Sequence, residues 1–213
     1  MTDPQPIRPD RDCAECPRLR SFLLDNREKY PDWHNAPVDS FGDINGEILI
    51  VGLAPGLKGA NRTGRPFTGD YAGDLLYETL IRYGLAEGSY KADPSDGLTL
   101  KNCRITNAVR CLPPENKPIG SEVKNCAPFL ISEIETMANL KIVLALGGLA
   151  HGAILTVLEE RKALFKFGHN VYHQLDRVLL ADSYHCSRYN TNTGRLTEQM
   201  FHDVFDEILA RLK

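Results

Sequence analysis

The sequence predicts an α/β protein, a three-layer sandwich in which a central four-stranded parallel sheet carries helices on both faces. Four short apolar runs alternate with longer segments whose apolar residues have helical spacing. The third run is apolar almost throughout, as expected of a parallel strand buried on both faces. No linker or repeat interrupts this alternation, so we expect a single domain with a loose tail at residues 1–12. The four runs are 47–53, 103–109, 141–146 and 177–182.

In the first half of the chain, the apolar spacing of residues 19–23 predicts a helix that ends at about Lys29. Residues 30–43 show no periodic pattern and are expected to be irregular. A glycine-rich loop follows the first strand, and a helix is expected over 71–84. Residues 88–100 are polar and contain glycine and proline, which predicts a further loop.

The second half continues the alternation. Pro113-Pro114 ends strand pairing after the second strand and predicts an extended loop. A helix is expected over 121–137, with Ser121 as its cap. Gly147-Gly148 leads into another helix that ends at about residue 160.

The last part of the chain contains an irregular connector, 164–174, and then the fourth strand. Thr197 begins a closing helix, because the apolar residues after it follow a helical period. These residues are Met200, Phe201, Val204, Phe205, Ile208 and Leu209.

Composition limits the possible classes. Of 213 residues, 42% are hydrophobic and 25% are charged, a balance typical of globular proteins. No apolar run approaches the length of a membrane span and no secretory signal is recognisable, so we expect a cytoplasmic monomer without a membrane partner. The net charge of −3 argues weakly against a nucleic-acid partner. Basic residues gather in the loops, however, so one face of the protein can still be basic.

Six cysteines in a chain of this character indicate a metal or redox role rather than disulfides. Cys13 and Cys16 form a Cys-x-x-Cys pair, which fits a redox pair, a zinc knuckle or half of an iron–sulfur site. All-thiolate ligation suits iron–sulfur and zinc alike, and spacing alone leaves the two at even odds.

The loop at 52–73 contains six glycines, which let the backbone approach a ligand closely. It lacks both the Gly-x-x-x-x-Gly-Lys-[Ser/Thr] pattern of phosphate loops and the Gly-x-Gly-x-x-Gly pattern of dinucleotide sites, so it needs another ligand. Its candidate groups are the positive Arg62 and Arg65, the flat ring of Phe67 and the carboxylate of Asp70.

Two more loops follow strands of the same sheet. One runs from Asn107 to Asn116 after the second strand, and the other contains His185 after the fourth strand. Because the carboxyl ends of parallel strands meet at one edge, we expect the three loops to form a single site.

The motifs in these loops resemble those of one known family. They are Gly-Leu-Ala-Pro-Gly, then Asn-Arg-Thr-Gly-Arg-Pro-Phe-Thr-Gly-Asp, then Asn-Ala-Val-Arg-Cys-x-Pro-Pro-x-Asn-Lys-Pro, then His-x-Ser-x-x-Asn-Thr-x-Thr-Gly-Arg-Leu-Thr. With the N-terminal Cys-x-x-Cys-Pro-Arg-Leu, they make the chain from about residue 13 similar to family 5 (B-type) of the uracil-DNA glycosylase superfamily. Leu53 stands where the related family 4 has a catalytic carboxylate, and Cys186 stands where the last motif often has proline.

The resemblance implies an enzyme that flips uracil out of DNA and hydrolyses its glycosidic bond in base-excision repair. His185 would donate a hydrogen bond to uracil O2 as negative charge develops there. Asp70, assisted by Asn116, would orient water and stabilise the cationic sugar. Similar family members also accept hypoxanthine and other deaminated bases. The base pocket would include Gly52, Leu53, Ala54, Phe67, Asn107 and His185.

The chemistry of three of these side chains supports the same roles but leaves alternatives. Phe67 can stack on a flipped base or can be a core phenylalanine. Asn107 can pair with the O4/N3 edge of uracil or can hydrogen-bond to backbone at the strand end. Asp70 can position water or can cap the helix that begins at Tyr71.

Single- and double-stranded DNA is the expected partner. Arg188 and Tyr189 are candidates for the wedge that fills the gap left by the base. Ser187 and the loop amides are expected to hold phosphates. The other candidate DNA contacts are Arg62, Arg65 and Asn190.

The resemblance also favours a [4Fe–4S] cluster with a structural role, held by Cys13, Cys16, Cys111 and Cys126.

Two other classes of protein compete with the glycosylase. One is an iron–sulfur protein that binds DNA or senses damage without glycosylase activity. The other is a nucleotide-binding enzyme, which the missing lysine–serine signature disfavours.

Overall fold

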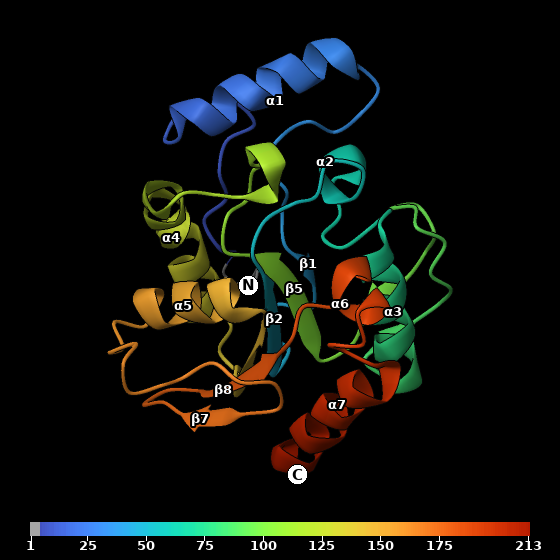
Figure 1. Ribbon diagram of the computed structural model, residues 1–213, viewed down its shortest axis with the longest axis vertical. Coiled ribbons are helices and arrows are strands. Elements are labelled where there is room, and N and C mark those ends of the chain that lie inside the picture. The colour runs from blue at the N-terminus through green and yellow to red at the C-terminus, as the bar shows by residue number, and fades with distance from the viewer. Residues whose placement is uncertain (1–4) are drawn as a thin grey trace.

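Four parallel strands form the centre of the protein, whose computed structural model describes residues 5–213 (Figure 1). Their residues are buried apart from Leu179, which is half-buried, so aliphatic side chains occur on both faces. The predicted α/β fold with four central parallel strands is confirmed. In spatial order the strands are β5 (Cys103–Asn107), β2 (Ile48–Gly52), β6 (Ile142–Leu146) and β8 (Leu179–Ser183).

Two short antiparallel strands extend this sheet at its edges. β1 (Phe41–Gly42) pairs with β5, and β7 (Tyr172–Gln174) pairs with β8. Both lie in segments expected to be irregular, because strands of two or three residues are too short to show a period. A separate pair, β3 (Ala86–Glu87) and β4 (Thr99–Leu100), frames the loop expected after the second helix.

Alternate residues of the central strands face two helical layers, which Figure 1 shows on opposite sides of the sheet. Ile48 and Ile50 pack in the layer of α3 and α7, whereas Leu49 and Val51 pack in the layer of α4 and α5. The side-chain period of two in a strand produces this division, and helices on both faces are confirmed. The bounds are α3 (Tyr71–Arg82), α4 (Gly120–Thr136), α5 (Gly148–Val157) and α7 (Glu198–Leu212).

The predicted capping residue is confirmed for helix α7 and is wrong for helix α4. Thr197 caps α7, since its hydroxyl accepts from the N–H of Met200 at 3.1 Å. The prediction that Ser121 caps α4 is wrong. The cap position is Ile119, whose N–H donates to the carboxylate of Glu122 at 2.9 Å.

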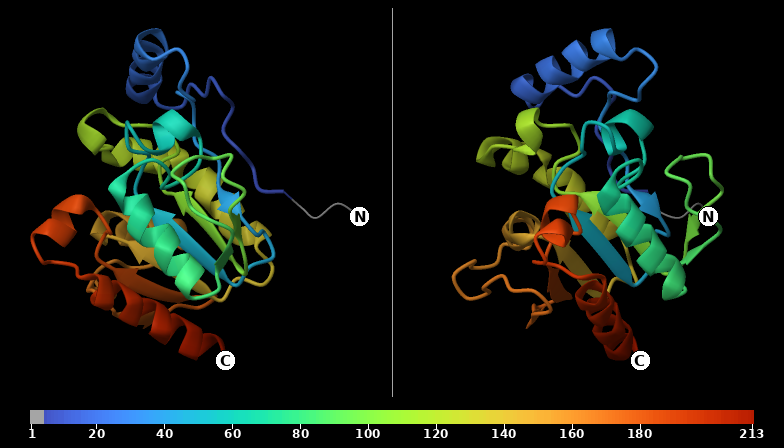
Figure 2. Two further views of the ribbon diagram at one scale, coloured as in Figure 1. Left: turned by 90° about the vertical axis from the view of Figure 1, so that its right-hand side faces the viewer. Right: turned by 45° about the vertical axis from the view of Figure 1, so that its right-hand side comes forward.

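The N-terminal helix α1 (Pro17–Lys29) lies at one end of the molecule, as Figures 1 and 2 show. Arg18 on this helix pairs with both carboxylate oxygens of Glu122 in α4, at 2.8 and 2.7 Å. Residues 5–12 have no regular secondary structure, yet the N–H of Ile7 donates to the hydroxyl of Ser132 at 2.9 Å. The predicted tail therefore lies against the domain over these residues, and its first four residues lie outside the described part of the chain.

Short helical turns occur in the three loops that leave the carboxyl ends of β2, β5 and β8. They are α2 (Ala60–Thr63), a 3₁₀ turn (Pro114–Asn116) and α6 (Arg188–Asn192). The sequence pattern predicts none of them, because three to five residues cannot show a helical period. Over residues 5–213, none of the helices has the length and apolar character that crossing a membrane requires.

Candidate active site

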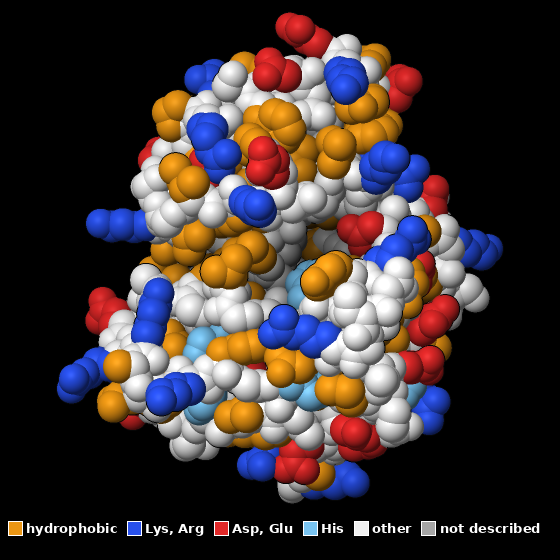
Figure 3. Space-filling model, in the orientation of Figure 1, with side chains coloured by type: hydrophobic (Ala, Val, Ile, Leu, Met, Phe, Trp, Pro, Cys, Tyr) orange, Lys and Arg blue, Asp and Glu red, His pale blue; other side chains and the backbone are white. Residues whose placement is uncertain are grey.

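The loops that leave β2, β5 and β8 enclose a cavity of about 610 Å³. Figure 3 shows the corresponding face hollowed near its centre, with a histidine side chain at the hollow. The volume is in the range of small-molecule sites. The predicted residues that line it are Leu53, Ala54, Phe67, Asp70, Asn107, Asn116, His185, Ser187 and Arg188. The three loops therefore form one site, as the order of strands and helices predicts.

Phe67 forms one wall of this cavity, and Gly52 makes room for it. A Cβ on Gly52 would lie 2.6 Å from the Phe67 ring and 2.5 Å from the side-chain oxygen of Asn107. Glycine is therefore required at the end of β2 because an aromatic ring and an amide pack directly against its backbone. Gly52 and Asn107 are also register partners at the ends of β2 and β5.

The backbone of Phe67 is held in an unfavourable conformation. Its φ of 52° lies in the left-handed region, which a bulky residue adopts only when its surroundings impose it. The hydroxyl of Tyr90 accepts from the N–H of Gly69 at 3.2 Å and donates to the carbonyl of Phe67 at 3.3 Å. Burial raises the pKa of Tyr90 to about 12, so this phenol remains a donor at neutral pH.

Asn107 offers a free amide to the cavity. The residue is 3% exposed, and its side chain makes no hydrogen bond to any other residue of the described chain. The amide faces the open cavity, where it can donate to and accept from a ligand. The alternative of a strand-end residue bonded to backbone does not fit this geometry.

His185 presents its imidazole to the same space. The ring centroids of His185 and Phe67 are 5.8 Å apart, with 28° between the planes. Burial lowers the pKa of His185 to about 4, because the charged form loses hydration there. The imidazole is therefore neutral at physiological pH, and it can act as a hydrogen-bond donor without carrying charge.

Asp70 caps a helix and also lines the cavity. Its Oδ1 accepts from the N–H of Gly73 at 3.2 Å, which caps α3. Its Oδ2 packs against the backbone of Gly59, where a Cβ would clash with it. Desolvation in this position raises the pKa of Asp70 above 3.8. One carboxylate oxygen thus stabilises the helix while the residue also lines the cavity.

Arg65 does not have the position that a DNA contact needs. It is 5% exposed, and its two terminal nitrogens each donate to the carboxylate of Asp96 at 2.8 Å. The pairing with Arg65 holds the pKa of Asp96 well below its usual range. The Nε of Arg65 donates to the hydroxyl of Thr68 at 2.7 Å. The predicted DNA contact by Arg65 does not fit this buried and paired position. The guanidinium also lies against three rings, those of Phe41, Tyr77 and Tyr90.

Three other predicted DNA contacts are exposed, and one of them, Arg188, lines the cavity. Arg188 is exposed and lies over the ring of Tyr71, 5.3 Å from its centroid. Tyr189 is 72% exposed, as a wedge residue has to be. Arg62 is exposed too, but it lies beside a neighbouring surface groove instead of lining the cavity.

Two predicted contacts also brace the His185 loop. The side-chain N–H of Asn190 donates to the carbonyl of His185 at 2.8 Å. Ser187 caps α6, since its hydroxyl accepts from the N–H of Asn190 at 3.4 Å. These two bonds fix the backbone of His185, which directly precedes the short helix α6.

Sequence reasoning missed two residues of the site. Tyr71 lines the cavity beside Lys58, whose positive charge already marks it in the glycine-rich loop. Tyr90 supports the Phe67 backbone from a segment expected to be an ordinary loop. No local signal marks Tyr90, because its partners lie more than 20 positions away in the sequence.

The four predicted ligand cysteines come together beyond the cavity. Cys13, Cys16, Cys111 and Cys126 line one small pocket between α1, α4 and the loop after β5, and none is in a disulfide. The N–H of Arg110 donates to the sulfur of Cys126 at 3.3 Å. Burial raises the pKa of the Cys126 thiol to about 11 and also raises the pKa of Cys111.

The family model for the uracil DNA glycosylase superfamily matches residues 40–212. A type-5 uracil-DNA glycosylase of Pyrobaculum aerophilum is 41% identical over 202 residues, covering 93% of this chain and 88% of that protein. A type-5 uracil-DNA glycosylase of Thermus thermophilus is 42% identical over 203 residues, covering 92% and 91%. A type-4 uracil-DNA glycosylase of Pyrobaculum aerophilum is 34% identical over 142 residues, covering 65% and 64%.

The two type-5 proteins cover most of the chain, including all three loops of the cavity, whereas the type-4 protein matches a shorter part. Identity of about 40% over such a length goes well beyond shared fold alone. The chain belongs to the uracil-DNA glycosylase superfamily and, within it, resembles the type-5 proteins most fully among these relatives.

Proposed function

We propose that the protein is a DNA glycosylase that flips uracil out of DNA and hydrolyses its glycosidic bond, leaving an abasic site. The observation that carries this proposal is the convergence of Phe67, Asn107 and His185 on one cavity. A stacking face, an unpaired amide and a neutral imidazole are the groups needed to hold a flipped pyrimidine and release it. The relatives named uracil-DNA glycosylase support the same reaction.

Base recognition rests on Phe67 and Asn107. The ring of Phe67 can stack on the flipped base, because its backbone is held by Tyr90. The amide of Asn107 can accept from uracil N3–H and donate to O4, which completes the hydrogen bonds that the protein leaves unmade. Cytosine presents the opposite pattern at these two positions, so the amide reads uracil in this orientation and would read cytosine if turned by 180°.

Bond cleavage places negative charge on the leaving base and positive charge on the sugar. His185, neutral because its pKa is about 4, donates a hydrogen bond to uracil O2 as that charge grows. Asp70 orients the attacking water and faces the cationic sugar, with Asn116 at the same cavity. Its ionised form is required for both tasks.

The range of bases follows from the first motif. Leu53 lines the cavity where family 4 carries a carboxylate, so the pocket lacks one charged group that would reject other bases. We propose that hypoxanthine and other deaminated bases also enter. The protein is further proposed to act as a monomer in the cytoplasm, on single- and double-stranded DNA.

We also propose that the four cysteines hold a [4Fe–4S] cluster. Four free thiols line one pocket, and a backbone N–H already donates to one of the sulfurs. Within residues 5–213, no three of these sulfurs lie within 4.8 Å of one another, whereas tetrahedral zinc holds its thiolates about 4 Å apart. Such a cluster would join α1 to α4 and to the loop after β5, a structural role.

The test is excision from a labelled duplex with one uracil, followed by alkaline cleavage of the abasic site. Wild-type protein should cleave the uracil strand and spare a thymine control. Asn107→Ala and His185→Ala should each slow excision by roughly 10²-fold or more while the iron content stays unchanged. DNA binding without any base release would reject the glycosylase and favour the iron–sulfur DNA-binding alternative.

A further inference from the structure

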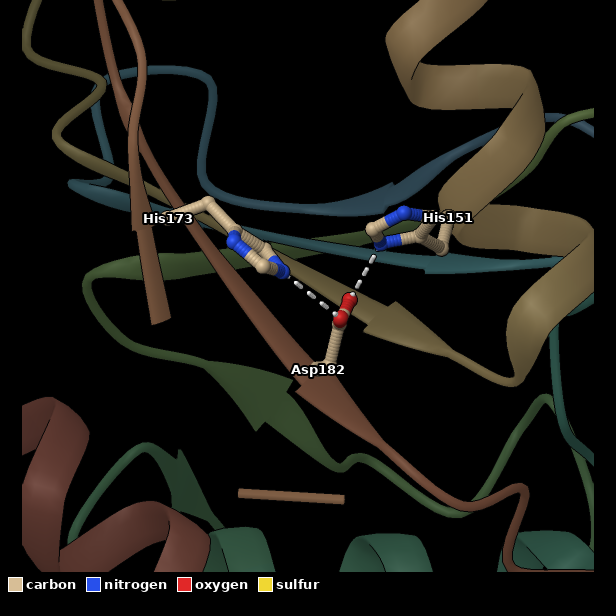
Figure 4. Close-up of side chains that lie close together, drawn as sticks. All are labelled: His151, His173 and Asp182. Carbon is tan, nitrogen blue, oxygen red and sulfur yellow. Dashed lines mark hydrogen bonds and ion pairs between the residues drawn. The ribbon is translucent and has the colours of Figure 1, made fainter. Parts of the chain in front are cut away.

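Three ionisable side chains meet on the face of the sheet that carries α5, outside the residues that line the cavity. They are His151 of α5, His173 of β7 and Asp182 of β8, and Figure 4 shows the carboxylate between the two imidazole rings. The side chain of Asp182 is fully buried, and those of His151 and His173 are 6% and 13% exposed. A buried carboxylate is costly unless a proton, a cation or hydrogen bonds compensate its charge.

The protons of this cluster can be assigned in part. Nε2 of His151 lies 2.9 Å from the carbonyl oxygen of Phe165, which can only accept, so Nε2 carries a proton. In the neutral ring, Nδ1 then directs a lone pair at Asp182 Oδ1, 2.8 Å away. Two lone pairs repel at this distance, so either a second proton or a cation must lie between them.

The second histidine decides between these two choices. His173 Nε2 lies 3.3 Å from Asp182 Oδ2, but it is buried and makes no hydrogen bond of acceptable geometry in the described chain. A second proton on His151 satisfies the first contact and leaves His173 without a partner. A cation at the centre accounts for both nitrogens and for the carboxylate.

We propose that His151, His173 and Asp182 bind a divalent transition-metal ion, with Zn²⁺ as the best match. The 3.3 Å between His173 Nε2 and Asp182 Oδ2 matches the separation of about 3.4 Å between ligand atoms of tetrahedral zinc, and the 2.8 Å contact of His151 Nδ1 with Asp182 Oδ1 has to widen by about 0.6 Å. Two imidazoles and a carboxylate are a ligand set that suits this ion. The bond from His151 to the Phe165 carbonyl is the outer-shell contact that orients a metal-bound histidine.

The position of this site gives the ion a structural role. It links α5, the edge strand β7 and the end of β8, and the N–H of Gly168 also lies 3.4 Å from Asp182 Oδ2. Through Phe165 and Gly168 it ties down the connector between α5 and β7. Because β8 leads directly into His185, the ion also stabilises the strand from which that catalytic loop departs.

The experiment uses the whole purified protein, incubated with excess Zn²⁺ and desalted, with zinc and iron measured by mass spectrometry. Wild-type protein and the control His34→Ala should retain about one zinc per chain, whereas His173→Ala and His173→Gln should retain none. Glutamine keeps the size and polarity of the edge position, so it separates metal binding from simple packing. Zinc should also raise the melting temperature of wild type and not of these variants.

Zinc retained equally by the His173 variants would mean that it binds elsewhere, such as at the cysteines, and would overturn the proposal. Retention of no zinc by wild type would overturn it too, and would leave an imidazolium–carboxylate cluster. A fall in iron with zinc uptake would show displacement from the cysteine pocket and count against the histidine site. These outcomes do not depend on uracil excision.

Discussion

The ring of Phe67 and the imidazole of His185 lie 5.8 Å apart, although they come from loops after β2 and β8, which are not adjacent strands. β6 lies between those strands, and the two loops reach over it to meet. The flat wall of the cavity and its hydrogen-bond donor therefore depend on one another across the sheet edge. Predictions about the reaction follow from this contact and its neighbours.

Replacing Phe67 by leucine should slow uracil excision by roughly 5- to 150-fold, because stacking on a base is worth about 1–3 kcal/mol. Single-turnover excision from a uracil duplex measures this loss. Phe22→Leu on α1 is the matched control, since Phe22 is half-buried and does not line the cavity. Equal rates for Phe67→Leu and wild type would show that Phe67 is a core residue alone.

Asp70→Asn should lower the single-turnover rate by roughly 10²–10⁴-fold, since asparagine caps a helix but cannot act as a base. In wild type, the rate should fall as pH drops through the raised pKa of Asp70, and the variant should lack this fall. A rate near that of wild type would leave Asp70 as a helix cap.

The same substitution has a stability consequence. Burial raises the folded-state pKa of Asp70, so the folded protein binds the proton more tightly and loses stability as pH rises through that pKa. At neutral pH the charge therefore costs stability. The melting temperature of Asp70→Asn at pH 7 should equal or exceed that of wild type, and a clear decrease would contradict this account.

Tyr189→Ala and Arg188→Ala should impair excision from duplex DNA by roughly 10-fold or more and affect single strands less. A wedge offsets a flipping cost of a few kcal/mol, and a single strand has no pair to break. The measurement is the ratio of single-turnover rates on duplex and single-stranded uracil. Similar losses on both substrates would assign these side chains to general DNA binding.

Arg62 and Arg65 should behave differently although three positions separate them. Arg62→Ala should reduce the salt dependence of DNA binding by about 0.9 in the log–log slope, the value for one lost phosphate contact. Asp96→Asn breaks the buried pair with Arg65, so it should leave that slope unchanged and destabilise the fold by about 3–5 kcal/mol. An unchanged slope in Arg62→Ala would remove Arg62 from the DNA interface.

The protein as purified should be brown and contain about four irons per chain, in keeping with the four thiols that share one pocket. Cys111→Ser should sharply reduce soluble, folded protein, because it removes a link between segments distant in sequence. Cys103→Ser is the control, since this buried cysteine lies in β5, away from that pocket. Stoichiometric zinc without iron in anaerobically prepared protein would reject the cluster.

The central architecture could be predicted from the sequence because its signals are local. β2 and β6 are short aliphatic runs, β5 and β8 each contain a shorter one, and the covering helix α7 has its own apolar period. Once the strands are known to be parallel, their carboxyl ends share an edge. The meeting of Asn107, His185 and the glycine-rich loop follows from that order alone.

The edge strands and the partners of individual side chains depend on tertiary structure. β1 and β7 are too short to show a period, and they form because a neighbouring strand offers unpaired backbone groups. Arg62 and Arg65 look alike in sequence, and Asp96 with three aromatic rings decides which one is buried. The cluster around Asp182 has the same origin, since His151 and His173 reach it from other elements.

The four central strands, the two helical layers and the loops that form the cavity could therefore be predicted from local patterns in the sequence. The tertiary structure decided which charges are paired inside, how Phe67 is held and where the two histidines meet a carboxylate. The physical reason is that secondary structure follows from side-chain periodicity over a few residues. Buried polar groups instead require partners, and those partners come from any part of the chain that the fold brings near.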